Sequence, residues 1–185
     1  MKPHLQLAVL LMPLLVTVYA AASDLLRLDV AYDAGRYRLR ADLLVDTSAA
    51  DVRRLLTDYD HLADLNRSIK RSEVGAASTP YDARVKTEIR ACIPVYCRTL
   101  RRVEDVRELD GSLIAVIVPE QSDFRYGRTE WLFQDRGSQV LVQYRAEMEP
   151  AFSVPPLLGP ALIKQGIARE LRNLLDNLKR LAEAG

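Results

Sequence analysis

The chain has few of the side chains that most often catalyse reactions or bind metal ions. It holds two histidines and two cysteines in 185 residues, and it has neither a G-x-S-x-G nucleophile motif nor a glycine-rich phosphate loop. His4 lies in a segment that we expect to be removed, which leaves His61 as the single histidine. This histidine and a paired set of cysteines are too few ligands for zinc, and Asp58 with Asp60 lacks the rest of a calcium-binding loop. The sequence therefore predicts no metal and no cofactor, and His61 is interpreted as a solvated surface residue.

An excess of charge of one sign is also missing. The chain has 26 Lys and Arg residues against 25 Asp and Glu residues, and Lys2 is the only charged residue among the first 22. Without that segment the formal charges balance. Dedicated binders of nucleic acids or of anionic membranes usually carry a basic excess. The composition argues against both classes and predicts no nucleic-acid partner.

The N-terminus has the order of segments found in a secretory signal peptide. A basic residue precedes an almost wholly apolar run from Leu5 to Tyr19, and alanines occupy positions 20–22. Pro13 interrupts the run, whereas a membrane anchor needs roughly 20 unbroken apolar residues. We expect cleavage after Ala22, or alternatively after Ala20, and export to the periplasm if the source is Gram-negative. No later stretch is apolar enough over sufficient length to span a bilayer.

The two cysteines, Cys92 and Cys97, are separated by Ile-Pro-Val-Tyr. In an oxidising compartment a disulfide is the default for such a pair. Pro94 favours a turn, and neighbouring strands bring Cα atoms close enough for a bridge across the end of a β-hairpin. We therefore expect a disulfide. The alternatives are two free buried thiols or a redox-active pair, although a redox pair more typically has C-x-x-C spacing.

Alternation of apolar and polar residues predicts an antiparallel sheet of about seven strands. Every second residue of the first strand, Arg36–Val45, is apolar, and most of the others are charged. Six strand-like segments follow, and turn signals such as Asp110-Gly111 separate neighbours. These segments are 69–75, 83–92, 96–108, 113–119, 125–134 and 139–149.

Helical spacing of apolar residues occurs after the first strand and at the C-terminus. A short helix is expected over Ala49–Thr57 with Thr47 or Ser48 as its N-cap, and a second short helical piece over 61–65. A long amphipathic helix is expected from about residue 157 to 184. Residues 23–185, taken as a single domain, thus predict an α+β fold in which a curved antiparallel sheet wraps around the long C-terminal helix. A space between the straight helix and the curved sheet is the expected ligand site.

Three short motifs accompany these elements. They are Val45-Asp46-Thr47-Ser48-Ala49-Ala50-Asp51-Val52, Leu55-Leu56-Thr57-Asp58-Tyr59-Asp60, and Pro150-Ala151-Phe152 before the long helix. Together they resemble the START-like helix-grip superfamily, and within it the polyketide cyclase/dehydrase and coenzyme-Q-binding START-like group, over about residue 36 to the end. The resemblance implies a hydrophobic cavity for lipids, isoprenoid quinones, sterols or polyketides, and no single reaction. The export signal and the disulfide depart from the family's commoner cytosolic and organellar members, so a quinone-chaperone or polyketide role does not follow from the resemblance.

Most of the expected cavity residues lie on inward faces of the last two strands and on the apolar stripe of the long helix, while Phe152 opens the loop before that helix and Tyr59 is expected at the cavity mouth. Candidate ligand contacts are Tyr59, Trp131, Phe133, Tyr144, Met148, Phe152, Ile163 and Ile167. The alternative for the strand and helix residues is ordinary core packing. For Tyr59 the alternative is a place in a loop that Asp58 and Asp60 order by capping.

Several charged residues bear on whether the protein performs chemistry. Asp123 and Arg125 share the parity of Trp131, so they are, with Tyr144, the candidates for proton transfer in the cavity; the alternative is a surface pair. Three arginines at positions 98, 101 and 102 break the alternation of their strand. This pattern predicts a bulge or an exposed edge.

Three functions remain open at this point. The sequence favours non-enzymatic binding or carriage of an apolar small molecule, such as a lipid or an isoprenoid quinone. The second possibility is an enzyme of cyclase or dehydratase type that acts on a hydrophobic substrate. The third is a protein-interaction module of the cell envelope that uses the arginine-rich strand or the outer face of the long helix.

Overall fold

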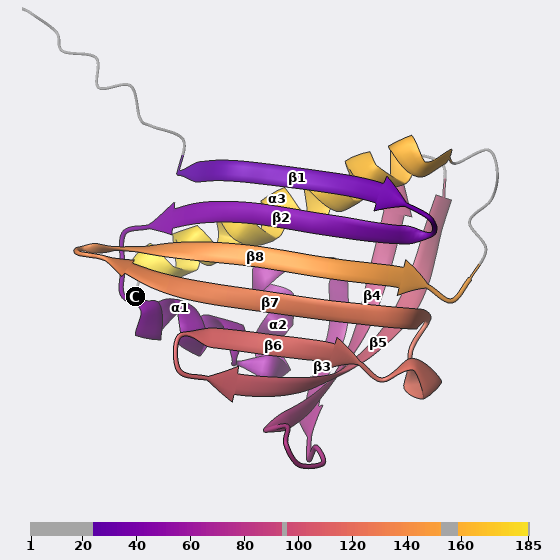
Figure 1. Ribbon diagram of the computed structural model, residues 1–185, viewed down its shortest axis with the longest axis horizontal. Coiled ribbons are helices and arrows are strands. Elements are labelled where there is room, and N and C mark those ends of the chain that lie inside the picture. The colour runs from indigo at the N-terminus through magenta and orange to yellow at the C-terminus, as the bar shows by residue number, and fades with distance from the viewer. Residues whose placement is uncertain (1–23, 94–95, 153–158, 185) are drawn as a thin grey trace, which may run out of the picture.

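The structure is a computed structural model that describes residues 24–93, 96–152 and 159–184. Within these ranges an antiparallel sheet and one long helix are the main layers, and the short helices α1 and α2 lie close together beside the sheet (Figure 1). The predicted signal peptide lies outside the described residues. The elements in chain order are β1 (Leu25–Asp33), β2 (Arg36–Val45), α1 (Ala49–Leu56), η1 (Tyr59–His61), α2 (Leu62–Leu65), β3 (Ile69–Gly75), β4 (Ala83–Ile93), β5 (Tyr96–Leu109), β6 (Ser112–Ile117), η2 (Pro119–Gln121), β7 (Phe124–Arg136), β8 (Gln139–Pro150) and α3 (Gly159–Ala184).

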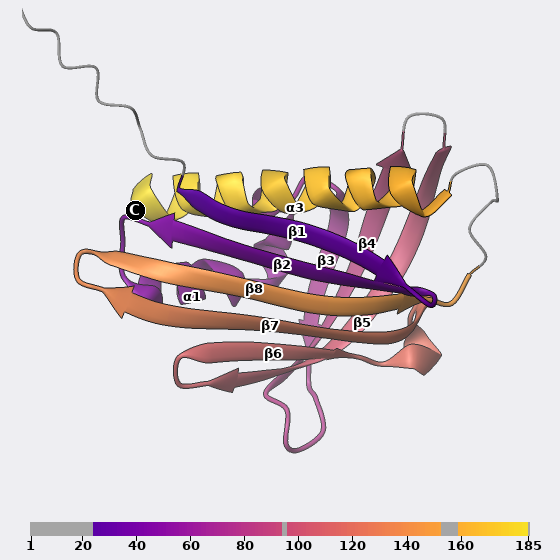
Figure 2. The same ribbon diagram turned by 45° about the horizontal axis from the view of Figure 1, so that its top comes forward.

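The sheet has the strand order β1-β2-β8-β7-β6-β5-β4-β3, with every neighbouring pair antiparallel. Strands that follow one another in sequence pair directly, except that β2 pairs with β8 and thereby joins the two ends of the fold. The sheet bends so strongly that β3, β4 and β5 cross behind the other strands and approach α3 (Figures 1 and 2). The predicted α+β helix-grip architecture is confirmed.

The described part of the sheet has eight strands, one more than the sequence analysis proposed. The additional strand is β1, which pairs with β2 along its whole length and places Leu28 and Val30 against the core. The two strands meet in a two-residue turn whose residues, Ala34 and Gly35, have φ angles of 47° and 90°. Positive φ at both positions is typical of the turn that matches the twist of a tight hairpin.

Helix α1 begins where the sequence predicted. Ser48 is the N-cap, and its side-chain oxygen accepts a hydrogen bond from the Asp51 backbone N–H at 3.2 Å. This bond satisfies one of the free N–H groups at the start of the helix. Val52 and Leu56 are buried, so α1 is held against the sheet and α3 at one end of the molecule.

Helix α3 has two halves with different surroundings. In its C-terminal half Leu175 and Leu178 are fully buried, and they pack into the main core with residues of β2, β8 and α1. Burial of each such leucine stabilises the fold by roughly 2 kcal/mol. In the N-terminal half Ile163 and Ile167 are only partly buried, because a cavity lies beneath them. The C-terminal half of the helix is therefore packed into the core, and its N-terminal half covers the cavity.

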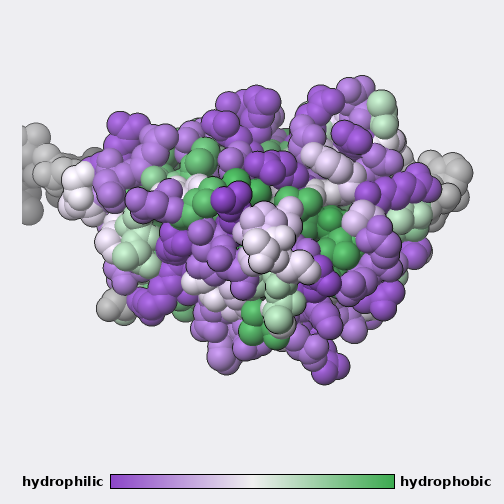
Figure 3. Space-filling view, turned by 60° about the horizontal axis from the view of Figure 1, so that its bottom comes forward, coloured by the Kyte–Doolittle hydropathy of each residue, from purple (hydrophilic) through white to green (hydrophobic). Residues whose placement is uncertain are grey.

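Figure 3 shows the side of the molecule that faces downward in Figure 1. Polar and charged side chains cover most of this face, and hydrophobic side chains appear in separate areas. No helix in the described part of the chain is both long and apolar enough to cross a membrane.

Candidate functional site

A cavity of about 270 Å³ lies between the N-terminal half of α3 and the concave face of the sheet. Small-molecule sites commonly enclose roughly 300–1,000 Å³, so this volume suits a compact ligand or part of a longer one. The lining comes from most strands of the sheet and from α3, and it is predominantly apolar. Its aliphatic and aromatic members include Leu39, Ile89, Ala91, Leu100, Ile117, Phe124, Leu171 and Leu174.

Five of the eight candidate residues from the sequence line this cavity. They are Tyr144, Met148, Phe152, Ile163 and Ile167. Inward alternation on β8 accounts for Tyr144 and Met148, and helical spacing on α3 accounts for Ile163 and Ile167, whereas Phe152 lies just beyond the end of β8. Direct contact between these side chains and a ligand stays a prediction.

Trp131 and Phe133 occupy the same concave face and are absent from the described lining of the cavity. Both pack against the main core, where α1 and the C-terminal half of α3 fill the space above β7. Trp131 also contacts Tyr144, with the ring centroids 4.5 Å apart. The alternation along β7 correctly predicted that these side chains face inward. It could not predict whether they lie beneath α1, where the core is packed, or beside the cavity.

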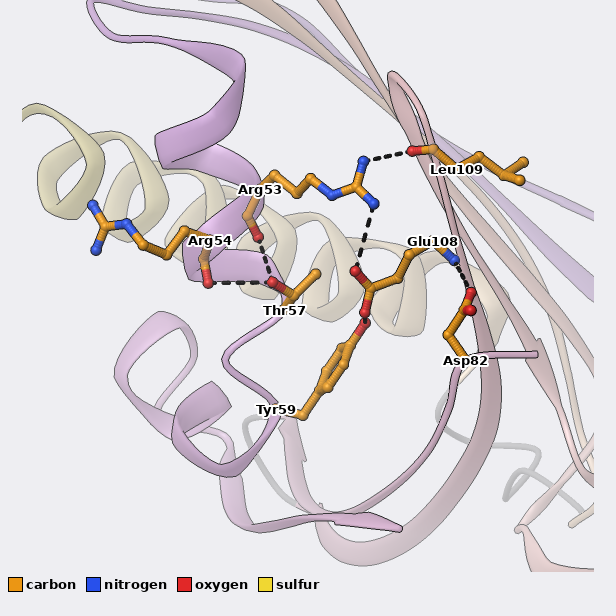
Figure 4. Close-up of polar contacts among 7 residues, drawn as sticks. All are labelled: Arg53, Arg54, Thr57, Tyr59, Asp82, Glu108 and Leu109. Atoms are coloured by element: carbon orange, nitrogen blue, oxygen red, sulfur yellow. Dashed lines mark hydrogen bonds and ion pairs between the residues drawn. The ribbon is translucent and has the colours of Figure 1, made fainter. Parts of the chain in front are cut away.

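Tyr59 lies in a separate polar cluster that ties α1 and η1 to β5 (Figure 4). Its hydroxyl donates to Glu108 Oε1 at 2.8 Å, and Arg53 reaches Glu108 Oε2 at 3.5 Å and the Leu109 carbonyl at 2.5 Å. Burial and the neighbouring carboxylate of Glu108 raise the pKa of Tyr59. The Glu108 backbone N–H donates to Asp82 at 2.7 Å. Tyr59 is not among the described cavity residues, and its contacts join elements of the fold.

The polar end of the cavity is an ion pair that the sequence analysis did not find. Arg102 and Glu104, both on β5, line the cavity, with Arg102 Nε 3.0 Å from Glu104 Oε2. Glu104 is 7% exposed. This Nε atom is buried and, among the described residues, makes no contact with hydrogen-bond geometry, so the attraction to Glu104 is purely electrostatic. The pair gives a predominantly apolar cavity a place to contact a polar group, and Asn66, Thr129, Glu147 and Glu170 are further polar members of the lining.

Of the bulge or exposed edge predicted at the arginines of β5, the bulge is absent. The pairing of β4 with β5 runs from Ala83 to Ile93 without a register shift. Arg98 and Arg102 therefore alternate with Arg101, and they share the inward face with Leu100. The alternation of Arg98, Leu100 and Arg102 was visible in the sequence. It was not interpreted as an inward face because charged side chains usually lie on the surface. An inward arginine becomes acceptable here because Glu104 also faces inward.

Tyr144 lies close to this ion pair and stays protonated over a wide pH range. Burial raises the pKa of Tyr144 to about 12; the negative charge of Glu104 adds to the rise, and the positive charge of Arg102 and a hydrogen bond with Thr129 oppose it. Its hydroxyl is therefore neutral near pH 7. As a group in the cavity it can donate a hydrogen bond, and it is not a base.

Replacement of Tyr144 by Phe is expected to reduce the loss of stability at alkaline pH. The unfolded chain releases the tyrosine proton near pH 10, whereas the folded protein holds it until about pH 12. Native stability therefore falls as the pH rises between these values, by about 2 kcal/mol from this group. Urea unfolding of both proteins at pH 9 and pH 11.5 measures the difference. An equal loss in both would contradict the assignment.

The other titratable candidates lie away from the cavity. Asp123 accepts a hydrogen bond from the Arg101 backbone N–H at 2.7 Å, and Arg125 lies 3.9 Å from a carboxylate oxygen of Glu149. His61 is exposed, and its ring nitrogen lies 2.7 Å from Asp58 Oδ1, which raises the pKa of the imidazole. None of these three is among the described lining residues of the cavity.

The predicted disulfide between Cys92 and Cys97 is present, with an S–S distance of 2.09 Å. The two residues are directly paired across β4 and β5, as expected for a bridge near the end of a hairpin. Cys92 also contributes to the cavity lining. The disulfide therefore fixes the strands that form one wall of the cavity.

The cavity reaches the surface at the end of this hairpin. Tyr96 lines the cavity and is 38% exposed. The guanidinium of Arg98 lies 4.1 Å from the centre of the Phe152 ring, and Arg169 of α3 donates to the Cys92 carbonyl at 2.9 Å. We call this region the rim, which consists of residues 90–93 and 96–101, Phe152, and the start of α3 at residues 159–169. Figure 2 shows the hairpin beside the beginning of α3.

Comparison with known sequences gives one family match. The profile of the family described as polyketide cyclase / dehydrase and lipid transport matches residues 36–183. This range runs from β2 to the end of α3 and contains the whole described cavity. No curated protein matches the sequence significantly.

Solved structures share the fold at low sequence identity. A START superfamily protein from Mycobacterium smegmatis has a TM-score of 0.64 and 17% identity, with 80% of this chain and 97% of that chain covered. An aromatase/cyclase from Streptomyces sp. R1128 has a TM-score of 0.63 and 13% identity, with 80% and 94% covered. A STAR-related lipid transfer protein from Xanthomonas axonopodis has a TM-score of 0.60 and 17% identity, with 82% and 98% covered. With a matching profile over most of its length and this fold, the chain belongs to the polyketide cyclase / dehydrase and lipid transport family.

Proposed function

We propose that the protein binds and carries an apolar small molecule, such as a lipid or an isoprenoid quinone, in the cavity beneath α3. The observation that carries this proposal is the predominantly apolar lining of the cavity, in which Arg102 and Glu104 form an ion pair. Burial of apolar surface drives binding in such a cavity, and one polar contact orients the ligand. The printed description of the family, which includes lipid transport, supports the same function.

A second candidate function is chemistry of cyclase or dehydratase type. The observation in its favour is the cluster of Arg102, Glu104 and Tyr144 at one side of the cavity. A guanidinium can polarise a carbonyl oxygen, and a carboxylate can accept a proton. Carriage is the better supported of the two, because the carboxylate is occupied by its ion pair and Tyr144 is held neutral.

Extraction of the purified protein separates these possibilities. Mass spectrometry of an organic-solvent extract identifies a co-purified lipid or quinone, and incubation of the protein with that compound shows whether it returns unchanged. An unchanged, stoichiometric ligand supports carriage, whereas a dehydrated or cyclised product supports catalysis. Empty extracts together with no uptake from a lipid mixture would refute the cavity as a ligand site.

Replacement of Ala91 by Leu is expected to weaken binding of the extracted ligand, or of an apolar fluorescent probe, about tenfold. Ala91 lines the cavity from β4, and a leucine side chain there fills part of the 270 Å³ and displaces ligand atoms. Fluorescence titration measures the change in Kd. The matched control is Ala31→Leu on β1, an exposed position, which leaves Kd within about twofold. Equal binding by both variants would place the ligand elsewhere.

We also propose that the protein is exported, with residues 1–22 as its signal peptide. The Cys92–Cys97 disulfide supports this location, because stable disulfides are common in oxidising compartments and rare in the cytosol. Fractionation of the native cells and mass determination of the protein test it. An exported species that begins at Ser23 is expected, located in the periplasm if the source is Gram-negative, and an uncleaved cytosolic species would oppose it.

A further inference from the structure

A second cluster of hydrophobic residues, distinct from the buried main core, forms part of the cavity wall. Six residues belong to it, of which three are buried and three are partly buried. They are Leu100, Ile117 and Phe124, with Ala91, Met148 and Phe152 packed against them. All six line the cavity. The packing of this cluster therefore determines the shape of the space that a hydrophobic ligand would occupy.

Ile117 lies in a row of residues that crosses the floor of the cavity. It is the last residue of β6, it is 7% exposed, and it is paired with Glu104 of β5. Strand β7 lies on the other side of β6 (Figures 1 and 2), and its Gly127 is paired with Met148 of β8. All four residues line the cavity. Four neighbouring strands thus contribute one residue each to this part of the floor.

The space beside Gly127 is occupied by the side chain of Ile117. A Cβ atom added at Gly127 would lie 2.3 Å from Ile117 Cγ1, whereas carbon atoms in contact lie about 3.5–4.0 Å apart. The backbone does not require glycine here, since Gly127 is not among the glycines with a positive φ angle. A glycine inside a strand weakens the strand and often marks a close approach of another group. At Gly127 the approaching group is Ile117.

We propose that Ile117, which packs over Gly127, limits the size of the hydrophobic molecule that the cavity accepts. This limit presupposes the proposed binding of an apolar molecule in the cavity and names a residue that determines which molecules fit. A β-branched side chain has few allowed conformations, so Ile117 does not turn aside for a larger ligand. Because Gly127 contributes no side chain, a change at Ile117 directly changes the depth of the cavity.

The neighbours of Ile117 indicate which part of a ligand is limited. Ile117 adjoins Glu104, whose ion pair with Arg102 is the place for the polar group of the ligand. The cavity therefore favours a ligand that is narrow next to its polar group, and it excludes a ligand with an additional ring there. Such a ring would force the wall side chains out of their preferred conformations, which is unfavourable in a closely packed site.

Calorimetric titration of the purified protein with 2-naphthol and with 9-phenanthrol tests this limit. Both compounds carry one hydroxyl group, and 9-phenanthrol has one more fused ring, so the native protein is expected to bind 2-naphthol at least about tenfold more tightly. Ile117→Ala removes three carbon atoms and is expected to reduce this preference about tenfold, since each buried methylene contributes about fourfold to affinity. Gly127→Ala is expected to weaken binding of 2-naphthol about tenfold, because the added methyl group displaces Ile117 into the cavity. The double variant Gly127→Ala with Ile117→Ala is expected to bind 2-naphthol within about threefold of the native protein, because the two side chains no longer compete for one space.

Matched controls make the same substitutions outside the cavity. A Cβ atom at Gly75 on β3 would meet its nearest neighbour, the Arg84 carbonyl oxygen, at 3.9 Å, and Ile114 on β6 is not among the described lining residues. Gly75→Ala and Ile114→Ala are therefore expected to leave both affinities unchanged, and thermal unfolding confirms that each variant is folded. An unchanged preference in Ile117→Ala, or no recovery in the double variant, would overturn the size limit while binding in the cavity stands. Failure of the native protein to bind either compound would also overturn it, and the extraction experiment decides the proposed function independently.

Discussion

The substitution Glu104→Ala is expected to lower the free energy of unfolding by about 3 kcal/mol. Glu104 is 7% exposed, and its carboxylate lies 3.0 Å from Arg102 Nε. Without that carboxylate the guanidinium, whose side chain is 26% exposed, loses its ion-pair partner in a predominantly apolar cavity. Equilibrium unfolding in urea at pH 7, followed by circular dichroism, measures the loss.

Two controls separate this effect from ordinary truncation. The double variant Arg102→Met with Glu104→Leu removes both charges and keeps the volume, and its stability is expected to return to within about 1 kcal/mol of the native protein. The exposed pair of Arg27 and Asp29, also 3.0 Å apart, is the surface control, and Asp29→Ala is expected to cost less than about 0.5 kcal/mol. A loss in the double variant as large as in Glu104→Ala would show that packing, and not the unpaired charge, is responsible.

The ion pair has an implication for ligand recognition. Hydrophobic residues of similar volume often stabilise a core as well as a buried ion pair does, so stability alone does not explain two charges in this wall. A ligand with a polar end explains them, because Arg102 still has guanidinium N–H groups to donate to it. Combined neutral substitution is therefore expected to preserve the fold and to weaken binding of the extracted ligand.

Much of the fold could be predicted because the sheet and the long helix bury one face each. The alternation of Val140, Val142 and Tyr144 with polar residues identified β8 and its inward face, and all three are buried. Strand β1 was missed although Leu26, Leu28, Val30 and Tyr32 alternate with mostly charged residues, which is the same strand signal that identified β2. In the structure β1 is held by its pairing with β2 and by the tight turn that joins the two strands.

The site was less accessible to sequence reasoning than the fold. Parity placed Tyr144 and Met148 correctly on the concave face, but it also selected Trp131, which lies under α1 at the filled end. Only the tertiary position of α1 separates these cases. Arg102 and Glu104 were overlooked because each, taken alone, belongs on the surface. Their inward placement depends on the pairing of β5 with β4 and on their attraction to each other.

Replacement of a side chain by alanine is expected to affect stability in the C-terminal half of α3 and ligand binding in the N-terminal half. Leu178→Ala removes a fully buried side chain from the main core and is expected to lower the free energy of unfolding by about 3 kcal/mol, with ligand affinity almost unchanged. Ile167→Ala removes a partly buried side chain that lines the cavity. It is expected to cost at most about 1 kcal/mol of stability and to weaken ligand binding about fivefold. Urea unfolding and fluorescence titration measure both quantities for each variant.

The contrast between the variants is what tests the division of the helix. If Leu178→Ala weakened binding as strongly as Ile167→Ala, the helix would act as one rigid element and the cavity would depend on its full length. Exposed Arg172, on the same helix, supplies the control, since Arg172→Ala is expected to alter neither quantity. If Leu178→Ala lowers only the free energy of unfolding and Ile167→Ala lowers mainly ligand affinity, the C-terminal half stabilises the fold and the N-terminal half contributes to ligand binding. That separation explains how a single helix can close an apolar cavity without a tightly packed core beneath it, because the anchoring energy comes from the other end.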